Sequence, residues 1–422
     1  MNSGLYDVIV IGGGPAGSTA SALLAVKGRR VLVLEKEKFP RYHVGESMMP
    51  FCWYTLERLG VLEEMERIAY TKKYSVQFVT QDGRQSQPFY FFQHHDHPSS
   101  TTWQVERADF DLMLLNNARA KGAEVREQTA VQRVIKNDTG QVIGVSATGP
   151  DGRSYEVFAP MTIDCSGREQ VATARDGWRK KDPGLNKMAI WTYYRGAKRD
   201  PGIDEGNTTV AYVPERGWFW YIPMRSNVVS VGVVAERDYL FSESKDPAAI
   251  FAREIERNAW IKDHLSTGEQ FGEYWVTSEF SYRSRYCAAD GLLLAGDAYA
   301  FLDPVFSSGV FLALKSGELA ADAVDAALTA GDVSGARFLD YGESLCRGIE
   351  TMRKLVYAFY DTDFSFGRVI KAYPHLRGRL TDCLIGDLFE KDYDELFGAI
   401  AEFAELPEPL AHGRAPTSIV AA

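Results

Sequence analysis

The N-terminal part of the chain alternates between short apolar runs and a helical pattern. Residues 5–11 (LYDVIVI) and 29–35 (RRVLVLE) are apolar runs rich in aliphatic residues, and glycines follow the first one directly. Runs of this length next to glycine are typical of buried parallel strands. Residues 18–28 (STASALLAVKG), which lie between them, favour a helix. The pattern therefore predicts a strand–helix–strand unit of α/β type at the N-terminus.

The rest of the chain adds strands in the middle and helices at the end. Residues 75–92 alternate around Asp82-Gly83, a hairpin signal, and most of residues 185–280 are strand-like. Residues 291–298 (GLLLAGDA) predict another buried strand, whereas residues 336–405 fit helices. We therefore expect a doubly wound α/β domain, a second domain built on a β-sheet, and a helical C-terminal region. Further elements expected in the first domain are a helix at 106–121, strands within 124–163 and a helix at about 309–330.

Length, charge and cysteine content narrow the class of protein. A chain of 422 residues is too long for one compact core, so two packed domains are expected. The net charge of −10, from 47 basic and 57 acidic residues, argues against general nucleic-acid binding. No apolar run approaches the roughly 18 residues of a membrane helix, and the N-terminus lacks a signal-peptide pattern. Dispersed cysteines indicate reduced thiols in a cytoplasmic protein, and they are Cys52, Cys165, Cys287, Cys346 and Cys383.

A glycine motif follows the first predicted strand and opens the first helix. In Gly12-x-Gly14-x-x-Gly17 the first glycine permits a tight turn, and the second allows a pyrophosphate to approach the backbone. The third lets helix and strand pack closely, and the helix start offers free N–H groups to phosphates. Glu35 ends the second strand, where a carboxylate can accept a hydrogen bond from a ribose hydroxyl. The unit predicts dinucleotide binding, and NAD and FAD share this motif.

Two motifs further along the chain favour FAD. Residues 294–298 (LAGDA) follow an apolar strand and resemble the second FAD motif of flavin monooxygenases of the p-hydroxybenzoate hydroxylase type. Residues 164–167 (DCSG) are similar to the intermediate motif of that family, although no glycine directly follows the aspartate. Arg107 matches an arginine at a helix start that contacts FAD in the family. The resemblance implies a Rossmann-like FAD-binding domain with a β-sheet substrate domain. The implied cofactor site is Gly12, Gly14, Pro15, Ala16, Gly17, Glu35, Lys36, Arg41, Ser47, Arg107, Asp164, Gly296, Asp297, Pro304, Gly309 and Val310.

Residues 217–223 (GWFWYIP) place two tryptophans one residue apart in a predicted strand that we expect to end at Pro223. Alternate strand residues point to the same side, so Trp218 and Trp220 share one face. The pattern Trp218-x-Trp220-x-Ile222-Pro223 resembles the WxWxIP motif of flavin-dependent halogenases. The resemblance implies a wall that keeps the organic substrate from a flavin hydroperoxide, which then oxidises halide. The alternative is an aromatic pair that only packs a core.

The family uses a lysine to pass the halogen to the substrate, as a chloramine or as a hydrogen-bond donor to hypohalous acid. The candidate segment is residues 71–78 (TKKYSVQF), which resembles the family's stretch around that lysine. Lys73 fits the family position, and Lys72 points the other way if the strand has begun. A desolvated amine is nucleophilic and an ammonium group is a strong donor, so lysine suits both roles. The alternative is a pair of solvated surface charges.

Residues 303–310 (DPVFSSGV), after the second flavin motif, resemble the halide site of the family. The resemblance implies that Ser308 and Gly309 offer backbone N–H groups to the halide, which suits a helix start. An ordinary helix N-cap is the alternative. Tryptophan-type halogenases carry a glutamate two residues before that serine, whereas this chain has Phe306. The difference favours the phenol and pyrrole branch, similar to the chondrochloren halogenase, whose substrates are often tethered to a carrier protein.

The resemblance as a whole implies an enzyme that uses FADH2, O2 and chloride or bromide to halogenate an electron-rich aromatic molecule. Lys73, Trp218 and Trp220 form the implied catalytic centre. Because the sequence contains no second GxGxxG motif, we expect a flavin reductase partner or a transient visit by NAD(P)H. The alternatives are a flavin hydroxylase, a geranylgeranyl-reductase-like flavoprotein and a non-enzymatic FAD-binding scaffold. A hydroxylase or a reductase needs no lysine at position 73.

The domain organisation follows from these motifs. We expect an FAD-binding domain in three parts, a substrate domain in two parts, a helical C-terminal region and a flexible tail. Their limits are 1–74, 106–180 and 286–335 for the FAD-binding domain, 75–105 and 181–285 for the substrate domain, 336–406 for the helical region, and 407–422 for the tail.

One further segment, His94-His95-Asp96-His97, has the composition of a metal cluster. Neighbouring residues of an extended segment point to opposite faces and converge on one ion with difficulty. A polar loop is therefore the favoured interpretation.

Overall fold

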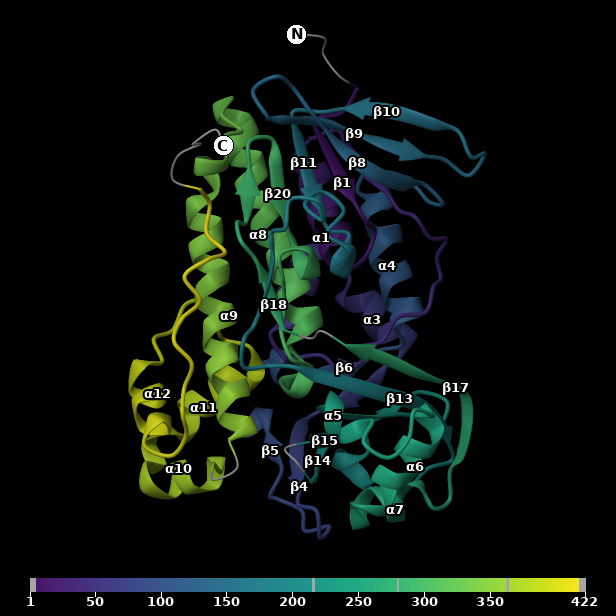
Figure 1. The fold of residues 1–422 in the computed structure, drawn as a ribbon, viewed down its shortest axis with the longest axis vertical. Coiled ribbons are helices and arrows are strands. Elements are labelled where there is room, and N and C mark those ends of the chain that lie inside the picture. The colour runs from purple at the N-terminus through teal and green to yellow at the C-terminus, as the bar shows by residue number, and fades with distance from the viewer. Residues whose placement is uncertain (1–4, 215–216, 279–280, 362–363, 417–422) are drawn as a thin grey trace.

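The computed structural model of the protein describes residues 5–214, 217–278, 281–361 and 364–416, and it combines a six-stranded with a seven-stranded sheet (Figure 1). The six-stranded sheet has the order β19-β20-β11-β1-β2-β7 and is parallel except at β19. Four of its strands are buried along their whole length, as the continuous apolar runs predict. The strands are β1 (Val8–Ile11), β2 (Val31–Leu34), β7 (Glu124–Arg126), β11 (Met161–Asp164), β19 (Ala288–Ala289) and β20 (Leu292–Leu294).

Helices cover one face of this sheet and a small sheet covers the other. Helix α1 (Pro15–Val26) packs against both α4 (Arg107–Ala120) and α8 (Ser308–Ala330). Alternate residues of β1 and β2 contribute to two separate cores, one shared with the helices and one shared with the small sheet. The parallel sheet and its helices are the expected Rossmann-like α/β domain, but the small sheet covers the face on which a doubly wound domain would carry further helices. The small antiparallel sheet consists of β8 (Ala130–Lys136), β9 (Val142–Thr148) and β10 (Ser154–Phe158).

The seven-stranded sheet, in the order β17-β13-β16-β15-β14-β4-β5, forms the second half of the molecule. One of its faces packs towards the main core, and the other is covered by the short helices α5 (Arg237–Leu240), α6 (Pro247–Glu256) and α7 (Ala259–Leu265). All pairs are antiparallel except β14 with β4. The strands are β4 (Ser75–Val79), β5 (Phe89–Tyr90), β13 (Lys187–Arg195), β14 (Thr208–Val213), β15 (Gly217–Met224), β16 (Val228–Glu236) and β17 (Glu269–Ser278).

Strand β15 carries both tryptophans and continues beyond the predicted end at Pro223. All eight of its residues are buried. Trp218 and Trp220 belong to the core on one face, whereas Phe219 and Tyr221 belong to the core on the other, so the predicted alternation holds. Pro223 lies past the end of the β14–β15 ladder and pairs only with β16, so its missing N–H leaves no gap in the β14–β15 ladder. The prediction that the strand ends at Pro223 was therefore wrong.

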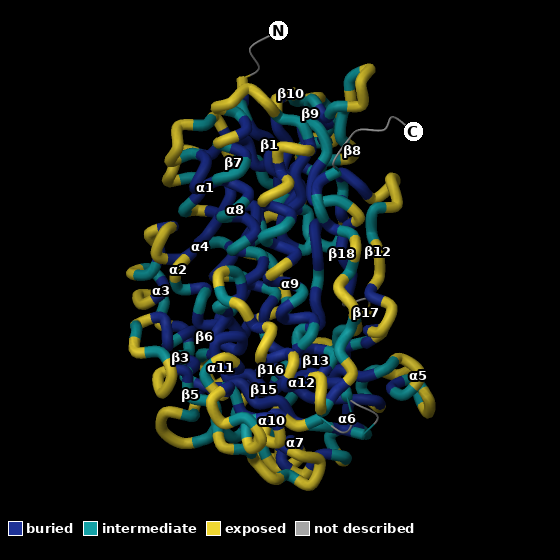
Figure 2. The backbone as a smooth tube through the Cα atoms, turned by 90° about the vertical axis from the view of Figure 1, so that its left-hand side faces the viewer, coloured by how far each residue is buried: buried dark blue, intermediate teal, exposed yellow. Residues whose placement is uncertain are grey.

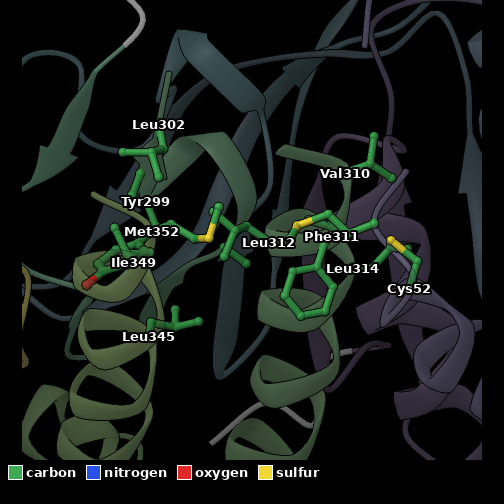
Figure 3. Packing of buried hydrophobic residues seen from close by; sticks show 14 of the residues in the cluster. Cys52, Tyr299, Leu302, Val310, Phe311, Leu312, Leu314, Leu345, Ile349 and Met352 are labelled. Atoms are coloured by element: carbon green, nitrogen blue, oxygen red, sulfur yellow. The ribbon is translucent and has the colours of Figure 1, made fainter. Parts of the chain in front are cut away.

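The C-terminal region is helical, as expected. Helix α9 (Leu339–Tyr360) runs beside α8 and leads to three short helices at the end of the molecule that holds the seven-stranded sheet (Figure 1). Leu312 of α8 and Met352 of α9 help to fill the space between the two long helices (Figure 3). The short helices are α10 (Phe366–Ala372), α11 (Arg377–Ile385) and α12 (Asp394–Ala401).

The described part of the predicted flexible tail is docked on the protein, contrary to expectation. Residues 407–416 run along α9 (Figure 1) and use their backbone carbonyls as acceptors. The buried Arg283 donates to the carbonyl of Leu410 at 2.7 Å, and Tyr299 donates to that of Gly413 at 2.7 Å. Composition predicted a loose end because proline breaks regular structure, but buried donors elsewhere in the chain hold this segment. Residues 417–422 lie outside the described residues.

The remaining segments connect the two sheets. In Figure 2 the inner strands of both sheets are dark blue, whereas edge strands such as β7 and β17 are teal and yellow, and most other exposed residues lie in connections and outer helices. Among the residues described, no helix is both long and apolar enough to cross a membrane. The connecting elements are α2 (Cys52–Leu59), α3 (Leu62–Ile68), β3 (Thr71–Lys73), β6 (Thr102–Gln104), β12 (Arg179–Lys181), β18 (Tyr282–Ser284) and β21 (Ala300–Phe301).

Candidate active site

A cavity of about 720 Å³ lies between the carboxyl ends of the parallel strands and the inner face of the seven-stranded sheet. Open α/β sheets bind their ligands at this edge. Two of the predicted cofactor residues, Gly17 and Asp164, do not line the cavity. Those that do are Gly12, Gly14, Pro15, Ala16, Glu35, Lys36, Arg41, Ser47, Arg107, Gly296, Asp297, Pro304, Gly309 and Val310.

The three glycines of the N-terminal motif have different surroundings. A Cβ atom on Gly12 would lie 2.5 Å from the carbonyl oxygen of Cys165, and one on Gly17 would lie 2.0 Å from that of Gly12. These two positions allow backbone to pack on backbone. A Cβ on Gly14 would meet only the Arg41 guanidinium at 3.5 Å, so Gly14 opens towards the cavity. The space beside Gly14, at the N-terminus of α1, suits a phosphate group.

Glu35 and the residues after β2 shape the next part of the cavity. The Glu35 carboxylate accepts hydrogen bonds from the backbone N–H of Gly13 at 2.7 Å and of Glu37 at 2.8 Å. It therefore joins the turn after β1 to the end of β2. Each carboxylate oxygen can accept more than one hydrogen bond, so the group can still receive a ribose hydroxyl.

Two arginines share one buried carboxylate at the cavity wall. Arg107, the first residue of α4, donates from Nε and Nη2 to the Asp111 oxygens at 2.8 and 3.0 Å. The Arg41 Nη1 atom lies 3.0 Å from Asp111 as well. Arg41 also lies 3.8 Å from Glu37, so the two guanidinium groups face one buried and one half-exposed carboxylate. Their N–H groups on the cavity wall suit an anionic ligand.

The two aspartates of the later flavin motifs differ in position. Asp164 is fully buried and accepts from the backbone N–H groups of Ser166 at 2.9 Å and Ala172 at 2.8 Å. It fixes the loop after β11 and stays behind the cavity lining. Asp297 lines the cavity, and burial raises its pKa to about 6. Of the two, Asp297 is the one placed to meet a ligand.

The N-terminus of α8 contributes to the cavity wall. Ser307 adopts a left-handed conformation with φ of 59° directly before the helix starts at Ser308. The Ser308 side chain is buried and does not line the cavity, whereas Gly309 lines it and has no atom within 4 Å of a Cβ position. The first turn of a helix leaves N–H groups without partners, so this turn can bind an anion through its backbone.

Trp218 and Trp220 both line the cavity, together with Ile222. Their indole N–H groups have different partners, because Trp220 donates to Ser230 at 3.1 Å and Trp218 donates to Tyr360 at 2.8 Å. Gly232 lies opposite Trp220 in β16, and a Cβ there would be 2.2 Å from the Trp220 ring. The missing side chain at Gly232 therefore provides the space that the Trp220 ring occupies.

Trp218 also touches a group of packed rings, here called the aromatic cluster. The Phe359 ring is 6.3 Å from Trp218, 5.2 Å from Tyr212 and 5.9 Å from Phe306, measured between ring centroids. These distances are typical of stabilising ring contacts. Phe306, which stands where tryptophan halogenases have glutamate, is thus part of an apolar surface. The members of the aromatic cluster are Phe78, Tyr212, Phe306, Phe359 and Phe366.

Lys73 is buried and has only neutral hydrogen-bond partners among the described residues. Its Nζ atom donates to the Ser47 hydroxyl at 2.9 Å and to the Met48 carbonyl at 3.2 Å, and it lies 5.8 Å from the centre of the Phe91 ring. Burial lowers the pKa of Lys73 to about 7. Lys73 does not line the cavity, but Ser47 does. The Ser47 side chain therefore connects the lysine to the cavity.

Lys72 points in the opposite direction, as strand alternation predicts. Its Nζ atom pairs with Glu66 at the surface and lies over the Trp103 ring. The structure therefore separates the two lysines into one buried amine and one solvated charge.

Glu46 is a cavity residue that the sequence analysis missed. It is buried, accepts from the Tyr193 hydroxyl at 2.7 Å and from its neighbour Gly45 N–H at 3.1 Å, and burial raises its pKa. Its position between Gly45 and Ser47, close in sequence to Arg41, was the available signal. A buried carboxyl on a cavity wall is a group that can hold or release a proton.

The histidine segment sends one side chain to a different partner from the other two. His94 bonds to Asp382 at 2.7 Å, whereas His95 and His97 both contact the Ser99 hydroxyl, at 3.0 and 2.9 Å. In the part of the chain that the structure describes, no three His, Cys, Asp or Glu residues are grouped to hold a metal ion.

Comparison with known proteins identifies the family of the chain. The family model described as tryptophan halogenase matches residues 7–99 and 80–368. The chain belongs to the tryptophan halogenase family. Family membership decides against the hydroxylase and geranylgeranyl-reductase alternatives, which share the fold and the flavin motifs.

Two relatives and two solved structures of flavin-dependent halogenases cover nearly the whole chain. The 1H-pyrrole-2-carbonyl-(peptidyl-carrier protein) chlorinase of Pseudomonas fluorescens is 30% identical over 96% of this chain and 96% of its own. The corresponding brominase of Pseudoalteromonas luteoviolacea is 32% identical over 91% and 93%. The flavin-dependent brominase Bmp2 has a TM-score of 0.85 at 31% identity, covering 94% of this chain and 97% of its own. The chondrochloren halogenase CndH has a TM-score of 0.80 at 32% identity, covering 94% and 95%.

Proposed function

We propose that the protein is an FADH2-dependent halogenase that places chloride or bromide on an electron-rich aromatic ring, a pyrrole or phenol held on a carrier protein. Membership of the family supports halogenation. The observation that carries the proposal is Lys73, a buried amine that has no carboxylate partner among the described residues and lies beside a residue of the flavin cavity. Burying a lysine without a counter-ion is unfavourable, so such a residue indicates a chemical role.

The cavity residues fit FAD. The open space at Gly14 and the start of α1 would hold the pyrophosphate, Glu35 would bind a ribose, and the Arg41–Arg107 pair would add positive charge. Asp297 and Gly296 would meet the ribityl chain, and Pro304, Gly309 and Val310 the ring. Reduced FAD together with O2 supplies the oxidising power that converts halide into hypohalous acid.

The protein's own residues divide the remaining work. The backbone N–H groups at the start of α8, at Ser308 and Gly309, bind the halide. Trp218 and Trp220 close the cavity towards the aromatic cluster and exclude the organic substrate from the flavin. The Lys73 amine then takes the halogen, losing a proton as an N–halogen bond forms and water leaves, and transfers the halogen to the ring. A pKa of about 7 leaves much of this amine neutral at physiological pH.

The substrate class follows from the aromatic cluster and the relatives. Phe306 replaces the glutamate of tryptophan halogenases, so the site offers ring contacts where those enzymes offer a carboxylate. Both relatives named above act on a pyrrole attached to a peptidyl carrier protein. We propose the same substrate class here, with a flavin reductase as the source of FADH2. Five buried thiols without disulfides support a cytoplasmic location.

The deciding experiment compares Lys73→Met with Lys72→Met. Each variant receives chemically reduced FAD, O2, bromide or chloride, and a pyrrolyl carrier protein or free phenols, and mass spectrometry detects the products. We expect Lys73→Met to lose about 10²–10⁴-fold in halogenation, the range for removal of a group that acts on the reactants. FAD binding and FADH2 oxidation should persist in it, and Lys72→Met should resemble wild type. Hydroxylated product from the wild type, or full halogenation by Lys73→Met, would overturn the proposal.

A further inference from the structure

The two tryptophans of the wall are held by different parts of the molecule. Trp220 donates its N–H to Ser230 in the adjacent strand, so the sheet itself fixes this ring. Trp218 donates to Tyr360, the last residue of α9. Tyr360 in turn donates to Asp303 Oδ2 at 2.9 Å, so the Trp218 ring is connected to a segment outside its own sheet.

The direction of these hydrogen bonds is fixed by chemistry. An indole N–H can only donate, and an ionised carboxylate can only accept. A hydroxyl does both, so Tyr360 accepts from Trp218 and donates to Asp303 at the same time, and thereby links the two residues. Both Trp218 and Asp303 are buried, with 1% and 0% exposure, and loss of the bridge would leave a donor and a charged acceptor unpaired.

Asp303 connects the chain of bonds to the loop before α8. Its Oδ1 atom accepts from the backbone N–H of Val305 at 3.1 Å and thereby caps the single turn Pro304–Phe306. Pro304, Val305 and Ser307 line the flavin cavity. The wall, the end of α9 and the cavity loop are therefore joined by three consecutive hydrogen bonds.

We propose that Tyr360 and Asp303 are positioning residues for halogenation. They hold the Trp218 ring at a fixed position relative to the cavity loop, residues 303–307. This inference rests on the proposed function, because a displaced Trp218 ring would matter by letting the oxidant leak from the cavity. Without Tyr360 the Trp218 ring and the loop can move independently, hypohalous acid escapes past the wall, and less of the consumed FADH2 yields product.

The three hydrogen bonds that join Trp218, Tyr360, Asp303 and Val305 are here called the relay. The surroundings of Asp303 make the relay sensitive to pH. Burial raises the pKa of Asp303 to about 6, against the hydrogen bonds from Tyr360 and Val305. The charged groups on the neighbouring strands are Lys187, whose Nζ lies 4.2 Å from the centre of the Tyr360 ring, and Glu236, which pairs with Lys187 at 2.5 Å. Below pH 6 the protonated carboxyl becomes a donor and no longer requires the Tyr360 proton.

The first test measures halogenated product per FADH2 consumed in Tyr360→Phe, Trp218→Phe and the double variant. We expect Tyr360→Phe to lower this ratio about fivefold or more, as for a lost buried hydrogen bond, with FAD affinity unchanged. Because Phe at 218 has no N–H, the double variant should be no worse than Trp218→Phe alone. Additive losses, or an unchanged ratio in Tyr360→Phe, would overturn the inference.

A matched control lies on the same helix. Tyr357 donates to Asp182 in a separate ion-pair network, so Tyr357→Phe also removes a tyrosine–aspartate hydrogen bond from α9. It should leave the product ratio at the wild-type value. An equal loss in Tyr357→Phe would show that general weakening of α9, and not the relay, lowers the ratio.

The second test does not depend on catalysis. With ¹⁵N-labelled tryptophan, the Trp218 indole resonance is identified by its loss in Trp218→Phe. It should shift in Tyr360→Phe, and in the wild type it should titrate near pH 6 but stay constant in Asp303→Asn. A Trp218 indole resonance that neither shifts in Tyr360→Phe nor titrates in the wild type would refute the inference. If instead the resonance behaves as expected and the wild type makes no halogenated product, the relay stands and the proposed function fails.

Discussion

The cavity and the aromatic cluster meet at Trp218 but are filled in opposite ways. The cavity is built mainly from loops and glycine positions that leave about 720 Å³ of space. The aromatic cluster is built from side chains whose rings already touch each other. A ligand of the cavity enters space that the backbone has left for it. An aromatic ligand of the cluster must replace ring contacts with similar ones, which favours flat, apolar rings as occupants.

The largest expected effect tests the open side of this comparison. Gly14→Val should abolish FAD binding, because the side chain occupies the space beside α1 that a pyrophosphate needs. The fold should survive, since a Cβ at Gly14 meets only a flexible guanidinium at 3.5 Å. FAD titration and thermal unfolding measure the two outcomes.

Gly17→Val provides the contrast for this variant. Its Cβ would lie 2.0 Å from a backbone oxygen, so this substitution should prevent folding as well as FAD binding. Tight FAD binding by a folded Gly14→Val protein would show that the cofactor lies elsewhere.

The second prediction tests the filled side. Phe359→Ala should lower the free energy of unfolding by about 3–5 kcal/mol, because it leaves a void among five ring partners. FAD affinity should stay near the wild-type value, since Phe359 does not line the cavity. Urea unfolding and FAD titration are the measurements. Phe158→Ala is the control, because Phe158 is 47% exposed on β10 and its loss should have little effect. A small stability change in Phe359→Ala would mean that the cluster is loosely packed.

The smallest expected effect per measurement concerns Lys73, whose Nζ donates to the cavity residue Ser47, because the change in stability builds up one pH unit at a time. Burial lowers the pKa of Lys73 from 10.5 to about 7, so the folded state holds this proton less tightly than the unfolded state. The buried charge destabilises the fold fully below pH 7, and this cost disappears as the pH rises to 10.5. The stability of the wild type relative to Lys73→Met should therefore increase with pH, by at most about 1.4 kcal/mol per pH unit in that window.

Urea unfolding of both proteins at several pH values measures this difference, and Lys72→Met serves as the surface control. A difference that stays flat from neutral to alkaline pH would mean that Lys73 keeps an ordinary pKa and is accessible to water.

Local sequence patterns predicted the elements that depend on local physics. The apolar runs gave the parallel strands, the glycines gave the turn after β1, and alternation placed Trp218 and Trp220 on one face and separated Lys73 from Lys72. The pairing of Trp218 with Tyr360 could not be predicted, because 142 positions separate the two residues. The docked segment 407–416 escaped prediction for the same reason, since its partners are buried donors on distant elements.

Motifs taken from a resemblance located the cavity more reliably than they ranked the residues within it. Asp164 carries a motif position but accepts hydrogen bonds from its own loop, and Gly17 packs against the backbone of Gly12, so neither residue lines the cavity. Glu46 went unnoticed although it lies between Gly45 and Ser47, because a single glutamate in a polar segment looks like an ordinary surface residue in the sequence. Whether a motif residue touches a ligand depends on side-chain direction, which packing decides.

The empty position at Gly232 has a consequence for how this enzyme can change over generations. The Trp220 ring fills the volume that a side chain on β16 would otherwise occupy. Any larger residue at 232 collides with the ring unless position 220 shrinks at the same time, and a smaller residue at 220 alone leaves a hole. We therefore expect a substitution at one of these two positions to require a compensating change of side-chain volume at the other. A directed-evolution library that varies only one of them samples collisions and holes, whereas a paired library that conserves their summed volume can reshape the wall while keeping the sheet packed.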